Sequence, residues 1–236
     1  MGEQTTELEA SRRELDALLY SVSHDLRAPL RAIDGFSQAL LDDHSDKLDD
    51  EGLIYLSRLH AAAGRMGVMI DELVRLARLS RSELERADVD LSAVAREVAR
   101  GLQLANADRE VAVRIQDGIH ATGDPKLLRV IMESLLDNAW KFTARRPQAQ
   151  VEVQAARRHG ERIYSVRDDG VGFDMRYAER LFGPFQRMHP EREFSGSGIG
   201  LALAQRIVRR HGGRIWASAQ VDAGATFYFT LERKRA

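Results

Sequence analysis

The sequence predicts an α+β protein with two parts: a long N-terminal helical hairpin that forms a dimeric four-helix bundle, and an α/β sandwich with helices on one face of a mixed sheet. Two patterns support this prediction. In residues 7–80 apolar residues recur every three or four positions, which is typical of packed helices. Beyond residue 88 helical periods and strand-like alternation are mixed, which favours a sheet covered by helices.

The composition excludes several classes of protein. The chain has 236 residues, of which 44% are hydrophobic and 30% charged, so it can bury one or two ordinary cores. Lysine and arginine number 35 against 36 aspartates and glutamates, so we expect neither nucleic acid nor an anionic membrane as a partner. We find no long apolar run and no signal-peptide pattern, which predicts a cytoplasmic protein without a membrane segment. The absence of cysteine excludes disulfides and thiolate metal sites.

The hairpin is predicted from two apolar seams with heptad spacing. A polar stretch at residues 42–47 separates them and is expected to hold the turn. Each helix has only one partner inside a hairpin, so we expect a homodimer to bury what remains. Pro29 is expected to bend the first helix. The seams consist of Leu15, Leu19, Val22, Leu26, Pro29, Ile33, Phe36 and Leu40, and then of Leu56, Leu59, Ala63, Met66, Ile70, Leu73 and Ala77.

The helical period is lost and charge increases after residue 80. We therefore place a linker at residues 81–87, between a domain of residues 1–80 and a domain of residues 88–236. In the second domain Asp124 and Pro125 form a helix start, and the apolar pattern continues through Phe142. The other expected helices are residues 91–104 and 199–208, and the expected strands are residues 111–115, 151–153, 163–166, 214–217 and 226–230.

Two glycine clusters predict a phosphate-binding site in the second domain. They are Asp168-Asp169-Gly170-Val171-Gly172-Phe173 and Gly196-Ser197-Gly198-Ile199-Gly200-Leu201. Backbone without Cβ atoms can direct several N–H groups at phosphate oxygens, and the second cluster leads directly into a helix. The spacing fits neither a dinucleotide fingerprint nor a P-loop. Either cluster taken alone would also suit an ordinary surface turn.

Three polar side chains near these clusters suit a nucleotide. Asn138 and Lys141 are three residues apart on one predicted helix, so they share a face. An amide oxygen can bind Mg²⁺ and an ammonium group can bind phosphate. Asp168 ends a predicted strand, and its carboxylate could accept a hydrogen bond from an exocyclic amino group, which favours adenine over guanine. The alternatives are a solvated helix edge and a turn aspartate.

In this order the motifs resemble the catalytic ATP-binding domain of sensor histidine kinases, whose fold class also includes the gyrase, heat-shock chaperone and mismatch-repair ATPases. The segment from Ser21 to Leu30 resembles the H-box of the dimerisation and phosphotransfer domain in the same family. The details are most similar to the output module of bacterial phytochromes. The motifs that carry the resemblance are residues 138–143, Asp168-x-Gly170-x-Gly172, residues 182–185, Gly196-x-Gly198-x-Gly200 and Gly224-x-Thr226.

The resemblance implies a reaction and its participants. Residues 1–80 are then the dimerisation and phosphoacceptor domain, and His24, at an outward f position, takes the γ-phosphoryl group of ATP with Asp25 as base or orienting group. Mg²⁺ is the implied cofactor, and the receiver domain of a response regulator is the implied partner, accepting the phosphoryl group on an aspartate. The sensor domain would lie upstream, outside this chain. The implied nucleotide-binding residues are Asn138, which also binds the metal, Lys141, Phe142, Asp168, Gly170, Gly172, Phe185, Gly196, Ser197, Gly198, Gly200, Leu201 and Thr226, with residues 183–198 as the lid.

Three positions depart from the family pattern. Ser134 stands where relatives often have asparagine, Asp169 adds a negative charge near the nucleotide, and Ala28 replaces a threonine or asparagine that orients water for phosphatase activity. We therefore predict weak phosphatase activity. Two alternatives remain open: a gyrase-like ATPase without phosphohistidine, and a degenerate dimeric scaffold that binds nucleotide. His211 and the other histidines besides His24 are expected to be surface or cap residues.

Overall fold

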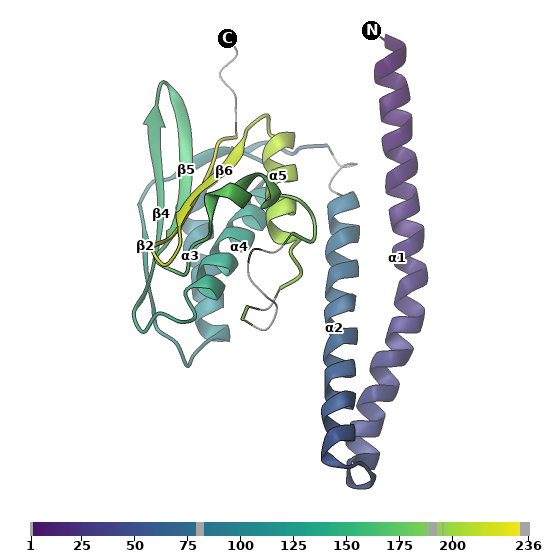
Figure 1. The fold of residues 1–236 in the computed structure, drawn as a ribbon. Helices are drawn as coiled ribbons and strands as arrows, with labels where there is room; N and C mark the ends of the chain where they lie inside the picture. The colour runs from purple at the N-terminus through teal and green to yellow at the C-terminus, as the bar shows by residue number, and fades with distance from the viewer. Residues whose placement is uncertain (1, 79–82, 187, 189–192, 195, 232–236) are drawn as a thin grey trace. The chain divides into compact units, whose positions relative to one another are not determined.

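The computed structural model describes residues 2–78, 83–186, 188, 193–194 and 196–231, and for residues 2–20, 24 and 76–78 it describes the backbone alone. The chain divides into two compact units, residues 1–82 and 83–236 (Figure 1). Part of the expected linker, residues 81–82, lies outside the described residues. Among the described residues, no helix combines the length and the apolar content that crossing a membrane requires.

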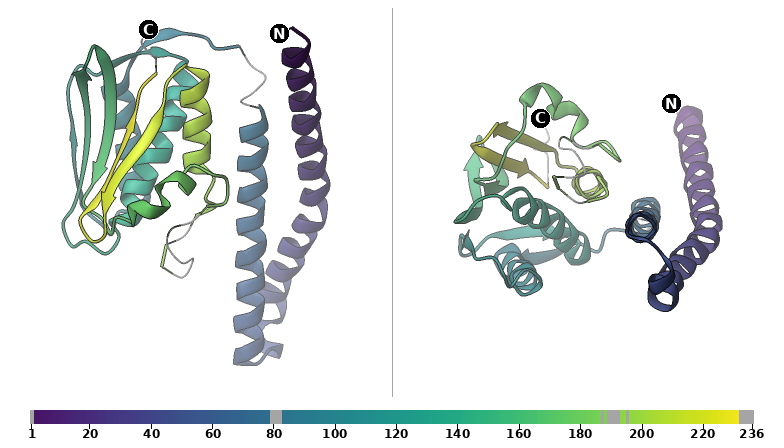
Figure 2. Two further views of the ribbon diagram at one scale, coloured as in Figure 1. Left: turned by 45° about the horizontal axis from the view of Figure 1, so that its top comes forward. Right: turned by 60° about the horizontal axis from the view of Figure 1, so that its bottom comes forward.

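The first unit is a helical hairpin, as predicted. Helix α1 (Gly2–His44) is followed by the short 3₁₀ helix η1 (Ser45–Lys47) and by α2 (Asp50–Arg78). The Asp49 carboxylate accepts a hydrogen bond from the Gly52 N–H at 2.8 Å, which satisfies one of the free donors at the start of α2. Helix α1 continues through Pro29 without interruption, and Figure 2 shows that it is curved.

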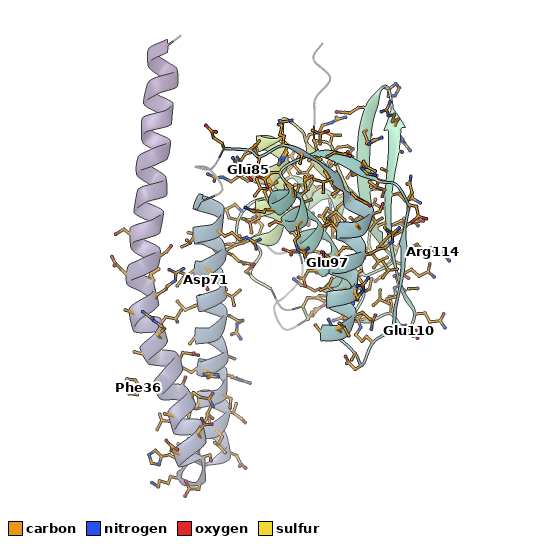
Figure 3. All side chains as sticks on the ribbon, turned by 180° about the vertical axis from the view of Figure 1, so that it is seen from behind. Phe36, Asp71, Glu85, Glu97, Glu110 and Arg114 are labelled. Carbon is orange, nitrogen blue, oxygen red and sulfur yellow. The ribbon has the colours of Figure 1, made fainter. Side chains whose placement is uncertain are left out.

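The interior of the hairpin is small. Leu30, Ala63 and Ile70 form its buried cluster, and the serines Ser23 and Ser37 are buried as well. Most described members of the predicted seams are instead exposed in the single chain; among them, Phe36 is 73% exposed and points away from α2 (Figure 3). The other exposed seam residues are Val22, Leu26, Pro29, Ile33, Leu40, Leu59 and Met66. The seams therefore form an outer apolar stripe more than an internal core.

The second unit contains a five-stranded mixed sheet with helices on one face, which confirms the predicted fold class (Figures 1 and 2). The strand order is β2-β4-β5-β7-β6; β2 and β4 are parallel and the other neighbours are antiparallel. A separate pair, β1 and β3, is antiparallel. The strands are β1 (Ala87–Asp90), β2 (Val111–Ile115), β3 (His120–Gly123), β4 (Ala149–Arg158), β5 (Glu161–Asp168), β6 (Ile215–Gln220) and β7 (Gly224–Phe229). The helices are α3 (Leu91–Ala105), α4 (Pro125–Phe142), the 3₁₀ helix η2 (Met175–Arg180) and α5 (Gly200–Arg210).

The core of this unit lies between the sheet and its helices. Alternate residues of the strands face inward, because side chains of a strand point to opposite faces in turn. Val151 on β4, Val166 on β5 and Phe229 on β7 are each 1% exposed. Leu135 and Leu136 on α4 are completely buried. Burial of such a side chain contributes about 1.5–3 kcal/mol, so this layer stabilises the unit strongly.

Helix α4 begins as the sequence predicts and gains an additional support. The Asp124 side chain caps the helix by accepting hydrogen bonds from the N–H groups of Lys126 and Leu127, and Pro125 occupies the first turn. His211, at the C-cap of α5, accepts a hydrogen bond on Nε2 from the Asp124 N–H and bonds the Ile207 carbonyl through Nδ1. His211 is a cap residue as expected, but it is only 1% exposed, and burial lowers its pKa.

Candidate functional site

The first glycine cluster contacts the C-terminal end of α4. The Val171 N–H donates to the Phe142 carbonyl at 3.1 Å, and a Cβ atom on Gly170 would lie 2.5 Å from that same oxygen. Gly172 has a positive φ of 58°, and a Cβ atom there would collide with the Gln220 carbonyl. Both glycines are therefore required for the loop to pass between α4 and the β6–β7 turn.

The second glycine cluster contacts the same helix along its side. A Cβ atom on Gly196 would lie 2.6 Å from Nζ of Lys141, and one on Gly200 would lie 2.8 Å from Oγ of Ser134. Oγ of Ser134 is buried and has no hydrogen-bond partner among the residues that the structure describes. Helix α4 thus lies between the two clusters, with Asn138 one turn away from both Ser134 and Lys141.

The start of α5 offers free hydrogen-bond donors at this place. Its N-cap residue, Ile199, provides no side-chain cap, and the first residue of the helix is Gly200. The first N–H groups of an α-helix have no partner inside the helix and carry a partial positive charge. This helix start and the unpartnered hydroxyl of Ser134 suit an anionic ligand such as a phosphate group.

Asp168 is the buried acid of the site. It ends β5, is 3% exposed, and accepts a hydrogen bond from the Gly170 N–H at 2.9 Å. Burial raises its pKa to about 6; hydrogen bonds from the backbone of Gly170 and Ala225 oppose this, and the charge of Asp169 adds to it. At neutral pH Asp168 is an ionised acceptor, which suits a ligand amino group.

The carboxylate of Asp169 accepts a hydrogen bond from the backbone. Its Oδ1 accepts a hydrogen bond from the Gln150 N–H at 2.9 Å, at the start of β4. The sequence predicts an added negative charge near the nucleotide at this position. The structure shows that it ties the glycine loop to the sheet, as the short Asp side chain often does beside a turn.

Arg146 is a residue that the sequence analysis missed. Its Nε donates to the Asp169 carbonyl at 2.7 Å, and its Nη2 donates to the carbonyls of Gly170 and Asp222. An arginine just beyond a helix carries no motif, so only the folded chain shows which carbonyls it joins. It connects the first glycine cluster to the β6–β7 turn.

The expected lid is described in part, because residues 187, 189–192 and 195 lie outside the described residues. Phe194 is 5% exposed, and its ring centroid lies 5.1 Å from that of Phe142. Arg145 stacks over the Phe194 ring at 5.2 Å and pairs with Glu193 at 3.0 Å. At the other end of the segment the Phe185 N–H donates to the Gly198 carbonyl at 3.0 Å. The sequence analysis did not identify Arg145, Glu193 or Phe194.

Most of the expected nucleotide-binding residues gather around α4, but Thr226 does not. Its neighbours on β7, Ala225 and Phe227, are buried on the helix side, so Thr226 lies on the opposite face of the sheet. There it lines an open hollow of about 820 Å³ with Arg167 and Ser218. The residues that surround the end of α4, the start of α5 and the two loops are Asn138, Lys141, Phe142, Asp168, Gly170, Gly172, Phe185, Gly196, Ser197, Gly198, Gly200 and Leu201.

The expected phosphoacceptor lies in the other unit. His24 is part of α1, but its side chain is outside the described residues, so its expected outward orientation stays a prediction. Asp25 and Ala28 are exposed on the same helix. No group of three or more His, Cys, Asp or Glu residues converges as a metal site within the described part of the chain. A cation at α4 would therefore need oxygen ligands from Asn138, from a bound ligand and from water.

Two family models match the chain, one on each unit. Residues 14–82 match the His Kinase A (phospho-acceptor) domain, and residues 123–235 match the histidine kinase-, DNA gyrase B- and HSP90-like ATPase. Cyanobacterial phytochrome A of Nostoc sp. is 32% identical over 95% of this chain and 29% of its own length. The methanogenesis regulatory histidine kinase FilI of Methanothrix harundinacea is 32% identical over 98% of this chain and 26% of its own length.

A solved structure is also similar to this chain. The full-length ShkA structure in complex with AMPPNP superposes with a TM-score of 0.65 at 26% identity, over 90% of this chain and 45% of that one. The chain spans less than a third of the two curated relatives. A phosphoacceptor domain followed by this ATPase fold defines the family, and the chain belongs to the sensor histidine kinases.

Proposed function

We propose that this chain is the catalytic core of a sensor histidine kinase that phosphorylates His24 from ATP and passes the phosphoryl group to an aspartate of a response regulator. The main support is the position of α4 between two glycine clusters that approach it closely, beside the uncapped start of α5 and the unpartnered hydroxyl of Ser134. This cradle fits a triphosphate. The complex of the similar ShkA with AMPPNP supports the same choice of ligand.

Each residue of the proposed site has a distinct role. Asp168 accepts a hydrogen bond from the adenine amino group, and Lys141, whose Nζ lies beside Gly196, neutralises phosphate charge. Asn138 would hold Mg²⁺ through its amide oxygen, and the metal would neutralise phosphate charge. The glycine clusters and the start of α5 hold the phosphates, while Gly198 fixes Phe185 at the base of the lid.

The proposed transfer needs little covalent help from the protein. An imidazole nitrogen of His24 forms a bond to the γ-phosphorus, the bond from that phosphorus to the bridging oxygen breaks, and ADP leaves. Asp25, the next residue on α1, orients the imidazole and accepts its proton. Catalysis comes mainly from positioning and charge neutralisation. The phosphoryl group then moves from His24 to an aspartate of a receiver domain.

We propose the same domain boundaries as the sequence suggests: residues 1–80 for the dimerisation and phosphoacceptor domain, 81–87 for the linker and 88–236 for the catalytic domain. The exposed apolar stripe on α1, which includes Phe36, supports a homodimer that closes a four-helix bundle. Ala28, exposed on α1, has no polar group to orient water, which supports weak phosphatase activity.

The decisive test is incubation of the protein with γ-labelled ATP and Mg²⁺. We expect label on the protein that is labile in acid and stable in alkali, and we expect its complete loss in His24→Gln. His44→Gln is a matched control, because His44 also lies on α1 and is exposed. Label that persists in His24→Gln would overturn the assignment of the phosphoacceptor.

The same assay separates the two alternatives. Release of free phosphate without label on the protein would support a gyrase-like ATPase. Binding of ATP with neither label nor free phosphate would support a nucleotide-binding scaffold, for which Ser134 is the favouring feature. If the protein behaves as such a scaffold because Ser134 limits metal binding, we expect Ser134→Asn to recover labelling.

A further inference from the structure

Arg146 links three main-chain carbonyls that belong to two different segments. Its guanidinium donates to Asp169 at 2.7 Å and to Gly170 at 3.3 Å in the first glycine cluster, and also to Asp222 in the β6–β7 turn. The Arg146 N–H donates to the Thr143 carbonyl at 2.8 Å, which attaches this arginine to the end of α4. Three segments therefore meet at one residue.

These segments form the surroundings of Asp168. The loop that follows Asp168 is held on one side by the bond from Val171 N–H to the Phe142 carbonyl, and on the other by the bond from Asp222 N–H to the Val171 carbonyl. Asp222 has a positive φ of 60°, a conformation that is uncommon for non-glycine residues and that aspartate adopts more readily than most, as in this turn. Without Arg146, the bonds that join the Asp169 and Gly170 carbonyls to the turn are lost.

Arg146 is well suited to this role because of its chemistry. A guanidinium group presents five N–H donors in a rigid plane, so it can satisfy several carbonyls whose directions are fixed relative to one another. A lysine has a compact ammonium on a flexible chain and cannot reproduce this arrangement. The geometry of the loop thus depends on the shape of the side chain as well as on its charge.

We propose that Arg146 is a positioning residue that sets the selectivity of the site for adenine, by holding the loop after Asp168 at the distance at which this carboxylate meets the base. This inference rests on the proposed function, in which Asp168 accepts the adenine amino group. Selectivity arises because guanine presents a carbonyl at that position, which a carboxylate held rigidly in place repels. A loose loop loses this discrimination.

The adjacent arginine provides a matched control. Arg145 contacts the described part of the expected lid, where it pairs with Glu193 and stacks on Phe194. Both arginines follow α4 directly, and both are exposed. Loss of Arg145 changes the segment that covers the phosphates, which ATP and GTP share, so it is expected to affect the two nucleotides equally.

The test is titration of the whole chain with MgATP and with MgGTP, for wild type, Arg146→Met, Arg146→Lys and Arg145→Met. We expect Arg146→Met to weaken ATP binding about tenfold, the cost of one charged hydrogen bond, with little change for GTP. Arg146→Lys is expected to be intermediate. Arg145→Met is expected to retain the wild-type ratio of ATP to GTP affinity.

The outcomes separate this inference from the proposed function. Circular dichroism and thermal unfolding without nucleotide establish that each variant is folded. A folded Arg146→Met or Arg146→Lys that retains the wild-type ratio would overturn the role of Arg146 and leave the kinase proposal intact. A wild type that binds ATP and GTP equally would overturn adenine recognition itself, and with it the basis of the inference.

Discussion

The two units of this chain have a similar apolar periodicity, but one buries its apolar residues within the chain and the other leaves them exposed. On α4 the apolar residues face the sheet of the same chain, and Leu135 and Leu136 are completely buried. On α1 the corresponding stripe faces away from α2, so Leu26 is 45% and Phe36 73% exposed. The amphipathic pattern alone therefore shows that a face will be covered, but not which molecule covers it.

This difference has consequences for stability. The second unit closes its own core between helices and sheet, so it can fold without a second copy. The hairpin buries a few apolar side chains together with Ser23 and Ser37, and its stripe stays in contact with water until another surface covers it. We expect the two units to respond differently to substitutions of the same kind.

The largest effect is expected for truncation of the core of the second unit. Leu135→Ala removes a completely buried side chain and leaves a cavity between α4 and the sheet, which lowers the free energy of unfolding by about 4 kcal/mol. Chemical denaturation followed by tryptophan fluorescence measures it, since Trp140 and Trp216 both lie in this unit. If Leu135→Ala also abolished the hairpin signal in circular dichroism, the units would not be independent.

A smaller but specific effect is expected on the hairpin. Phe36→Asp places a carboxylate in the apolar stripe, twice in a symmetric dimer, which weakens association by about 100-fold. Sedimentation velocity over a range of concentrations measures the dissociation constant. Leu104→Asp is the control, because Leu104 is 76% exposed on α3 of the other unit and is expected to leave the dimer unchanged. Equal effects of both variants would contradict the assignment of the stripe as the dimer interface.

Asp168 is expected to lower the stability of the second unit at neutral pH, because its charged carboxylate is buried there. Its pKa is about 6 in the folded protein against 3.8 for a free aspartate side chain, so the folded state binds this proton more tightly. Proton binding at Asp168 contributes fully to the free energy of unfolding below pH 3.8, and this contribution is lost as the pH rises through 6. Between about pH 4.5 and pH 7 this loss is about 2 kcal/mol.

Asp168→Asn removes this loss, because an amide can still accept the Gly170 N–H without carrying a charge. Without nucleotide the variant is therefore expected to be more stable than wild type at neutral pH, and to lose that advantage at low pH. ATP binding is expected to fall, because the adenine amino group loses a charged acceptor. Asp169→Asn is the control. A variant that is less stable than wild type at pH 7 would contradict the idea that Asp168 is retained for binding.

The sequence predicted those parts of the structure that have local causes. Strand β2 and helix α4 begin and end at the expected residues, because alternation, the Asp124 cap and Pro125 are local features. The two glycine clusters could be predicted because a close approach of backbone requires glycine, and glycine is visible in the sequence. The short strands β1 and β3 were missed, since four residues are too few to show a period.

The parts that the sequence did not predict depend on contacts between distant residues. Thr226 belongs to a matching motif, yet the alternation of β7 turns it to the face away from the helices. Arg146 bonds carbonyls that lie far along the chain, and His211 is buried because both of its ring nitrogens find partners in the fold. Such partners become visible only when the strand order is known.

The smallest effect is expected for an ion pair on the hairpin, and it sharpens the comparison of the two units. Arg27 and Asp71 join α1 and α2 at 2.7 Å, and the Asp71 side chain is 69% exposed (Figure 3). In water such a pair contributes about 0.5 kcal/mol or less, so Asp71→Asn is expected to change hairpin unfolding by no more than that. Thermal unfolding measured by circular dichroism at low and at high protein concentration tests this. A larger loss that appears only at the high concentration would show that dimerisation covers the pair, because an ion pair removed from water is costly to break. The pair then belongs to the interface, and the hairpin depends on its second copy for charge as well as for apolar contact.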